Sequence, residues 1–92
     1  MRIILEDRFL RSCLSRSPAD REGVFDALLG LDKALGDPHQ HSGRGLRKLH
    51  PSGIWEVRAG LGLRAVFTVR SDTATFLFLG THDELKRFLR GL

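Results

Sequence analysis

The chain has 92 residues and a formal net charge of +4, and 41% of its residues are hydrophobic. A chain of this length forms one small domain over residues 1–92, and its one cysteine, Cys13, excludes an intramolecular disulfide. No apolar run approaches the roughly 18 residues of a membrane span and the apolar start ends at Glu6, so we expect neither a membrane span nor a secretory signal, and we expect a cytoplasmic protein.

The first half of the chain has the pattern of a short strand followed by two helices. Residues 2–5 are apolar and predict a strand, and residues 6–15 predict a helix with one apolar stripe. Ser17 can cap a second helix, which apolar residues at three- and four-residue steps extend to Leu35. The following segment, 37–45, is rich in turn formers and lacks a period, so we expect a surface loop.

The second half alternates polar and apolar residues and predicts hairpins. Residues 46–50 predict a strand that ends at the Pro-Ser-Gly turn, and further strands follow from residue 53. A three-residue loop at 59–61 would place Glu56 opposite Arg64. A two-residue turn at 71–72 would place Phe67 opposite Phe76, Thr68 opposite Thr75 and Ala65 opposite Phe78.

The alternation divides the sheet into two faces. The apolar face is expected to carry Trp55, Val57, Leu63, Ala65, Phe67, Val69, Ala74, Phe76 and Phe78, and the polar face Glu56, Arg58, Arg64, Thr68, Arg70, Thr73 and Thr75. Val66, Leu77 and Leu79 also fall on the polar face, where the last helix of the chain or a helix of a partner protein could cover them. Thr81 and Glu84 form a capping box at the start of that last helix.

We therefore expect an α+β fold of the order β-α-α-β-β-β-α. In this fold an antiparallel sheet packs against an N-terminal helical pair, and a short helix ends the chain.

The charges are divided unevenly along the chain. Residues 1–43 hold six basic and seven acidic residues, whereas residues 44–92 hold nine basic and four acidic residues. Such a basic second half indicates an acidic partner such as a nucleic acid, although it is also compatible with a solvated surface.

The polar face and its neighbours contain the residue types that metal-independent RNA cleavage requires. A base must activate the 2′-hydroxyl, a cation must stabilise the pentavalent phosphate, and an acid must protonate the leaving 5′-oxygen. Glu56 and His50 are the candidate bases, Arg58 and Arg64 the candidate cations, and His82 the candidate acid. The structural alternative is an exposed Glu56–Arg64 pair.

His39 and His41 lack further metal ligands, so we expect no metal and no cofactor.

The second half resembles the RelE/ParE superfamily of bacterial toxin–antitoxin toxins. The motifs that carry the resemblance are RKL at 47–49, GIWEVR at 53–58, GLRAVF at 62–67 and GTHDEL at 80–85. The resemblance implies a ribosome-dependent mRNA endoribonuclease that a cognate antitoxin neutralises. It implies that Arg64 and Arg58 hold the phosphate and that His82 is the general acid, with Arg47, Lys48 and Arg70 binding the RNA.

The chain also departs from the family pattern. It contains no tyrosine, which some family nucleases place near the C-terminus, and residues 43–52 contain no carboxylate that could be the base of other members. His50 could take the role of that base. The alternatives are a ParE-like inhibitor of DNA gyrase, which needs no acid–base pair, and a non-catalytic member that binds its antitoxin and represses its operon.

Overall fold

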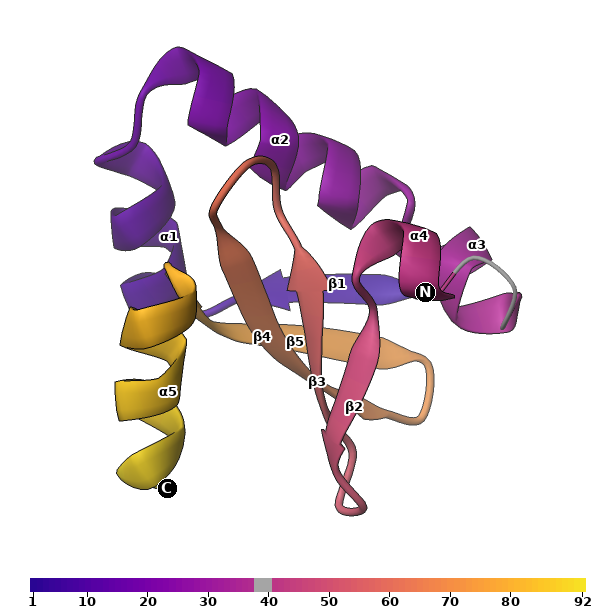
Figure 1. The fold of residues 1–92 in the computed structure, drawn as a ribbon. Coiled ribbons are helices and arrows are strands. Elements are labelled where there is room, and N and C mark those ends of the chain that lie inside the picture. Colours follow the sequence, from indigo (N-terminus) through magenta and orange to yellow (C-terminus); the bar gives the residue numbers. More distant parts are fainter. Residues whose placement is uncertain (38–40) are drawn as a thin grey trace.

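The structure, a computed structural model, describes residues 1–37 and 41–92 (Figure 1). The elements are β1 (Arg2–Leu5), α1 (Asp7–Leu14), α2 (Pro18–Leu29), α3 (Leu31–Gly36), α4 (His41–Arg44), β2 (Arg47–His50), β3 (Ile54–Arg58), β4 (Arg64–Arg70), β5 (Thr73–Gly80) and α5 (His82–Arg90). The α+β class is confirmed, with helices before and after the sheet. Within the described ranges, no helix is long and apolar enough to cross a membrane.

One five-stranded sheet has the strand order β1-β5-β4-β3-β2. Four strands follow the first helices, one more than the expected order contains, and they correspond to the patterns at 46–50 and from residue 53. The sheet is also not antiparallel throughout, since β1 pairs with β5 in parallel. The chain between β1 and β5 includes the helices and the other strands, which is long enough for the crossover that a parallel pair needs.

The β3–β4 register differs from the expected one by two residues. Arg58 pairs with Arg64, and Glu56 pairs with Val66, so the expected Glu56–Arg64 pairing is wrong. The loop between the strands spans residues 59–63 rather than 59–61, and its two glycines, Gly60 and Gly62, take positive φ angles of 102° and 76°. Each side chain still lies on its expected face, because the pairing moves by an even number of residues.

The β4–β5 hairpin contains a bulge that the alternation did not predict. The expected pairs Phe67–Phe76 and Thr68–Thr75 are confirmed, but Phe78 pairs with Val66 and Ala65 pairs with Leu79. The extra residue on β5 turns Phe78 away from the main core and turns Leu79 into it, where only 3% of Leu79 is exposed.

The helical half has two more helices than predicted. Ser17 does cap α2 by accepting a hydrogen bond from the Asp20 amide at 3.2 Å, but the expected long helix is interrupted at Gly30. A Cβ at Gly30 would clash with the guanidinium of Arg44, so glycine at this position leaves room for a side chain from the segment that follows α3. That segment contains the single turn α4, where only a loop was expected.

Two apolar layers hold the sheet. On one face α1, α2 and α3 cover a core in which the Phe67 and Phe76 rings stack at 4.9 Å and Phe9 packs on Phe76 at 5.2 Å. On the other face α5 packs on β4 and β5, and the Phe88 ring stacks on Phe78 at 4.6 Å. The chain's own last helix therefore packs over the face that contains Val66, which is fully buried.

Candidate functional site

Two arginines face each other at one end of the sheet. Arg58 is the last residue of β3 and Arg64 the first residue of β4, and the two are Cα partners in the ladder. Like charges placed directly opposite each other on a sheet are destabilising. No ion pair joins either arginine to a carboxylate in the part of the chain that the structure describes. This arrangement suits an anionic ligand that would neutralise both guanidinium groups.

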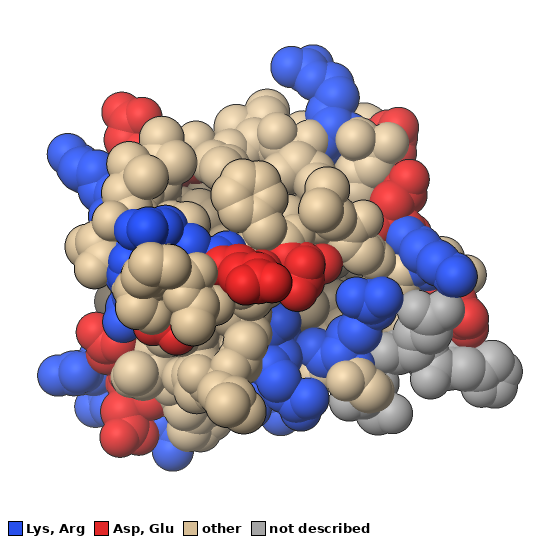
Figure 2. Space-filling view, turned by 90° about the horizontal axis from the view of Figure 1, so that it is seen from above, with Lys and Arg blue, Asp and Glu red and all other residues tan. Residues whose placement is uncertain are grey.

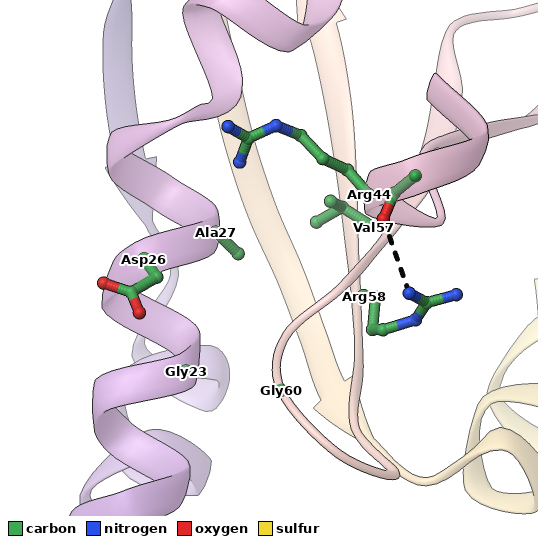
Figure 3. Close-up of a pocket in the computed structure, with 8 residues that line it drawn as sticks. Gly23, Asp26, Ala27, Arg44, Val57, Arg58 and Gly60 are labelled. Carbon is green, nitrogen blue, oxygen red and sulfur yellow. Dashed lines mark hydrogen bonds between the residues drawn. The ribbon is translucent and has the colours of Figure 1, made fainter. Parts of the chain in front are cut away.

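The segment before β2 passes close over these two arginines. Gly45 has a φ of +64°, and a Cβ added there would lie 3.0 Å from Arg64 Nη1 and 3.0 Å from Arg58 Cβ. Arg58 Nη1 donates a long hydrogen bond of 3.5 Å to the carbonyl oxygen of Gly43 (Figure 3). A glycine at position 45 thus allows the backbone to form one wall of the arginine site.

His82 lies at the same end of the sheet. Gly80, the last residue of β5, is the Cα partner of Arg64, and the chain turns directly from it into α5. The predicted capping box is confirmed, because Glu84 N–H donates to Thr81 Oγ1 at 3.2 Å and Thr81 N–H donates to Glu84 Oε1 at 2.9 Å. This cap fixes the start of α5 and holds exposed His82 on the first helical turn, two residues beyond Gly80.

Glu56 lies on the same face but pairs with a different arginine from the expected one. Its Oε1 is 3.1 Å from Arg47 Nη2 on β2, and its side chain is only 7% exposed. Its Oε2 is buried and has no hydrogen-bond partner among the described residues. Because Glu56 is opposite Val66, it is a diagonal neighbour of Arg64, at the distance of about 7–8 Å typical of such neighbours.

The structure does not bring His50 to this site. His50 pairs with Ile54, which is four residues, or about 13 Å, from Arg58 along β3. The His50 Nδ1 is 2.7 Å from Ser52 Oγ and accepts a 3.1 Å hydrogen bond from the Ser52 amide. His50 is therefore part of the β2–β3 turn, at the opposite end of the sheet.

The three expected RNA-binding residues lie in different places. Arg47 is next to the arginine site through its pair with Glu56, whereas Lys48 lies on the other face, with its Nζ 5.8 Å from the centre of the Trp55 ring. Arg70 is exposed at the end of β4, six residues or about 20 Å from Arg64. Only Arg47 can therefore contribute directly to a ligand bound at Arg58 and Arg64.

A cleft of about 230 Å³ lies between α2, α4 and the β3–β4 loop, next to the arginine site. In Figure 3 the Arg44 side chain reaches toward α2, whereas Arg58 points toward Gly43 on the other side. Arg44 belongs to the basic run RGLRK, but the sequence pattern there predicts only a loop and does not mark Arg44 as a site residue. Viewed from the side of α2, acidic and basic side chains lie beside each other on the surface (Figure 2).

The expected histidine pair offers no metal site that can be described. His39 lies outside the described residues. His41 contacts Trp55 edge to face at 5.9 Å, and its buried Nε2 has no hydrogen-bond partner within the described ranges. Across residues 1–37 and 41–92, no group of three or more potential metal ligands is found.

No protein-family model matches the chain, and no curated protein matches it significantly. The structure is similar to the solution structure of the conserved hypothetical protein HP0894 from Helicobacter pylori, with a TM-score of 0.54 and 21% identity over 92% of this chain and 98% of that chain. A crystal structure of a copper-bound mutant toxin from Helicobacter pylori gives a TM-score of 0.43 and 20% identity over 92% and 98% of the two chains. The first of these likenesses shows a shared fold.

Proposed function

We propose that this protein is the RelE-like toxin of a type II toxin–antitoxin system and cleaves mRNA on the ribosome. The single observation that carries the proposal is the Arg58–Arg64 cross-strand pair, which has no carboxylate partner in the described part of the chain and lies at the end of the sheet where β5 leads into His82. The sequence motifs that resemble the RelE/ParE superfamily come together at this pair. The α+β fold is the one that the resemblance implies.

The site can supply each group that the cleavage needs. In the proposed step the 2′-oxygen loses its proton to a base and attacks the adjacent phosphorus, while the bond from phosphorus to the 5′-oxygen breaks. Arg58 and Arg64 would stabilise the charge on the pentavalent phosphate through paired N–H groups, and His82 would protonate the 5′-oxygen. The unpartnered Oε2 of Glu56 is the candidate base on this face, because His50 is about 13 Å away along the sheet.

The proposed partners follow from the same surface. The ribosome and its mRNA would supply the phosphates, with Arg47 close to the cleavage site and Lys48 and Arg70 contacting RNA at more distant points. A cognate antitoxin would neutralise the toxin. No metal or cofactor is assigned a role in this mechanism.

Mapping of mRNA 5′ ends on translating ribosomes tests the proposal. Purified protein should create new ends in the decoding site, and Arg64→Ala and His82→Ala should each abolish them. Lys33→Ala is the matched control, because Lys33 is exposed on α3 and belongs to no proposed contact. An Arg64→Ala protein that is folded and still cleaves would contradict the assignment.

The ion pair of the buried Glu56 with Arg47 favours a second candidate. A carboxylate that is 7% exposed and already paired needs a rearrangement before it can act as a base. A ParE-like gyrase inhibitor or a non-catalytic antitoxin-binding member would need no such step. If folded protein leaves ribosome-bound mRNA intact, a gyrase supercoiling assay separates these two possibilities.

A further inference from the structure

The two edges of the sheet are protected to very different degrees. The β2 edge carries Arg47 and Lys48, has an irregular register between Lys48 and His50, and is followed by a proline, which are common protections against edge pairing. The β1 edge carries a single charge, Arg2 at its start, and has a regular register and no proline. Its central residues Ile3 and Ile4 are 39% and 40% exposed, and β1 is terminal in the strand order. This apolar edge is therefore a candidate surface for strand addition.

The hydrogen bonds of β1 show which backbone groups remain available. The amides of Arg2 and Glu6 donate to the carbonyl oxygens of Asp72 and Phe76 at 2.8 and 3.1 Å. In a parallel pair alternate residues direct their backbone groups to the same neighbour, so positions 2, 4 and 6 face β5. The N–H and C=O groups of Ile3 and Leu5 consequently point to the open edge.

We propose that the β1 edge pairs with the β1 edge of a second copy of this chain, antiparallel and centred on Ile4. In this register Ile3 of one copy lies opposite Leu5 of the other, and each such pair can exchange two backbone hydrogen bonds. Both pairs use only the groups that point outward. A two-fold axis through the paired Ile4 residues makes the interface isologous and joins the two sheets into one.

The charges at the ends of β1 favour a second copy over an unrelated strand. The centred register places Arg2 of each copy opposite Glu6 of the other, on the same side as the paired Ile4 side chains. Glu6 is still extended, with φ −67° and ψ 153°. Both side chains are exposed, and neither forms an ion pair with another described residue. A shift that pairs Ile3 with itself would instead put Arg2 opposite Ile4.

Charge reversal and charge exchange test this interface on the full chain. Analytical ultracentrifugation should show a monomer–dimer equilibrium, and Arg2→Glu or Glu6→Arg alone should raise the dissociation constant about tenfold by placing like charges opposite each other. The double variant Arg2→Glu/Glu6→Arg restores opposite charges and should return to within about threefold of the wild type. Arg90→Glu, an exposed reversal at the end of α5, is the control and should have no effect.

Amide hydrogen exchange provides a second measurement. The Ile3 and Leu5 amides should exchange more slowly as protein concentration rises, whereas the Arg2 and Glu6 amides, which already donate to β5 and its turn, should change little. A protein that remains monomeric at about 1 mM overturns the proposal. So does a dimer that tolerates either single reversal, or one that the double exchange does not restore.

Discussion

Glu56 and Arg47 form an ion pair across β2 and β3, with Oε1 and Nη2 3.1 Å apart, although their exposures differ greatly. The Glu56 side chain is 7% exposed and the Arg47 side chain 68% exposed. The second oxygen of Glu56 has no hydrogen-bond partner in the described part of the chain. The buried carboxylate therefore depends on a single surface arginine for compensation of its charge.

Removing that arginine should destabilise the domain more than its exposure indicates. We expect Arg47→Ala to lower the free energy of unfolding by about 1–3 kcal/mol, because it leaves a buried carboxylate without a partner. Urea unfolding measures the effect, and Arg70→Ala, another exposed strand arginine, is the control. The double variant Arg47→Ala/Glu56→Gln should recover part of the loss, and equal instability of the single and double variants would contradict this explanation.

The facing arginines Arg58 and Arg64 should show the opposite behaviour. Replacing either one by alanine removes a like-charge contact. Each variant should therefore have a free energy of unfolding equal to that of the wild type or about 0.2–1 kcal/mol higher. Thermal unfolding at low salt measures this gain, and added salt should reduce it by screening the wild-type repulsion. A marked loss of stability in both variants would instead indicate that the pair has a structural role.

The start of α5 should be sensitive to acid. Hydrogen bonds from Thr81, with smaller contributions from Arg16 and Arg87, hold the pKa of Glu84 below its ordinary value. The ionised form is thus favoured in the folded state, and its contribution to stability is present above the unfolded pKa, about 4.3, and is lost as the pH falls through the lower folded pKa.

Glu84→Gln tests this linkage. Between about pH 5 and pH 3 the variant should lose less stability than the wild type, because it has no carboxylate to protonate. Melting temperatures over that range measure the difference. Asp83→Asn is the control, because it changes the neighbouring carboxylate, which is not part of the capping box. Its stability should keep more of the wild-type pH dependence than that of Glu84→Gln.

The sequence predicts features that depend on neighbouring residues, such as helix caps and turns, but not features that depend on contacts between distant residues. The Ser17 and Thr81 caps and the turn after Arg70 depend on residues within a few positions of each other, and all three are present in the structure. The close approach of Gly30 to the Arg44 side chain depends on a residue 14 positions further along the chain, and no local pattern contains that contact. The bulge that turns Leu79 inward likewise depends on packing against the helices.

The candidate site shows the same division. Arg58, Arg64 and the start of α5 lie at one end of the sheet, because the faces of the strands follow from alternation and the start of α5 follows from one capping box. The pairing of Arg64 with Arg58, rather than with Glu56, depends on the length of the loop between β3 and β4, which turn preferences place at 59–61 and which spans 59–63 in the structure. The expected place of His50 at the site depends on strand proximity alone, whereas the ladder puts His50 at the other end of the sheet.

The packing of α5 makes a prediction that combines stacking and charge. The Phe88 ring stacks on Phe78 at 4.6 Å, and the Arg8 guanidinium of α1 lies 5.2 Å from the centre of the Phe88 ring and 5.4 Å from that of Phe78. Because Phe88 is only partly exposed, we expect Phe88→Ala to destabilise the domain by about 2–4 kcal/mol. Lys86→Ala on the exposed side of the same helix should have little effect.

A double-mutant cycle separates the cationic contribution from the stacking contribution. Arg8→Met keeps most of the side-chain length but removes the charge, and its cost should be smaller when Phe88 is already alanine. We expect a coupling free energy of about 0.5–1 kcal/mol, which is typical of a partly exposed arginine over an aromatic ring. Additive effects in urea unfolding would mean that Arg8 contributes no interaction with Phe88, and that α5 is held to the sheet by its apolar contacts alone.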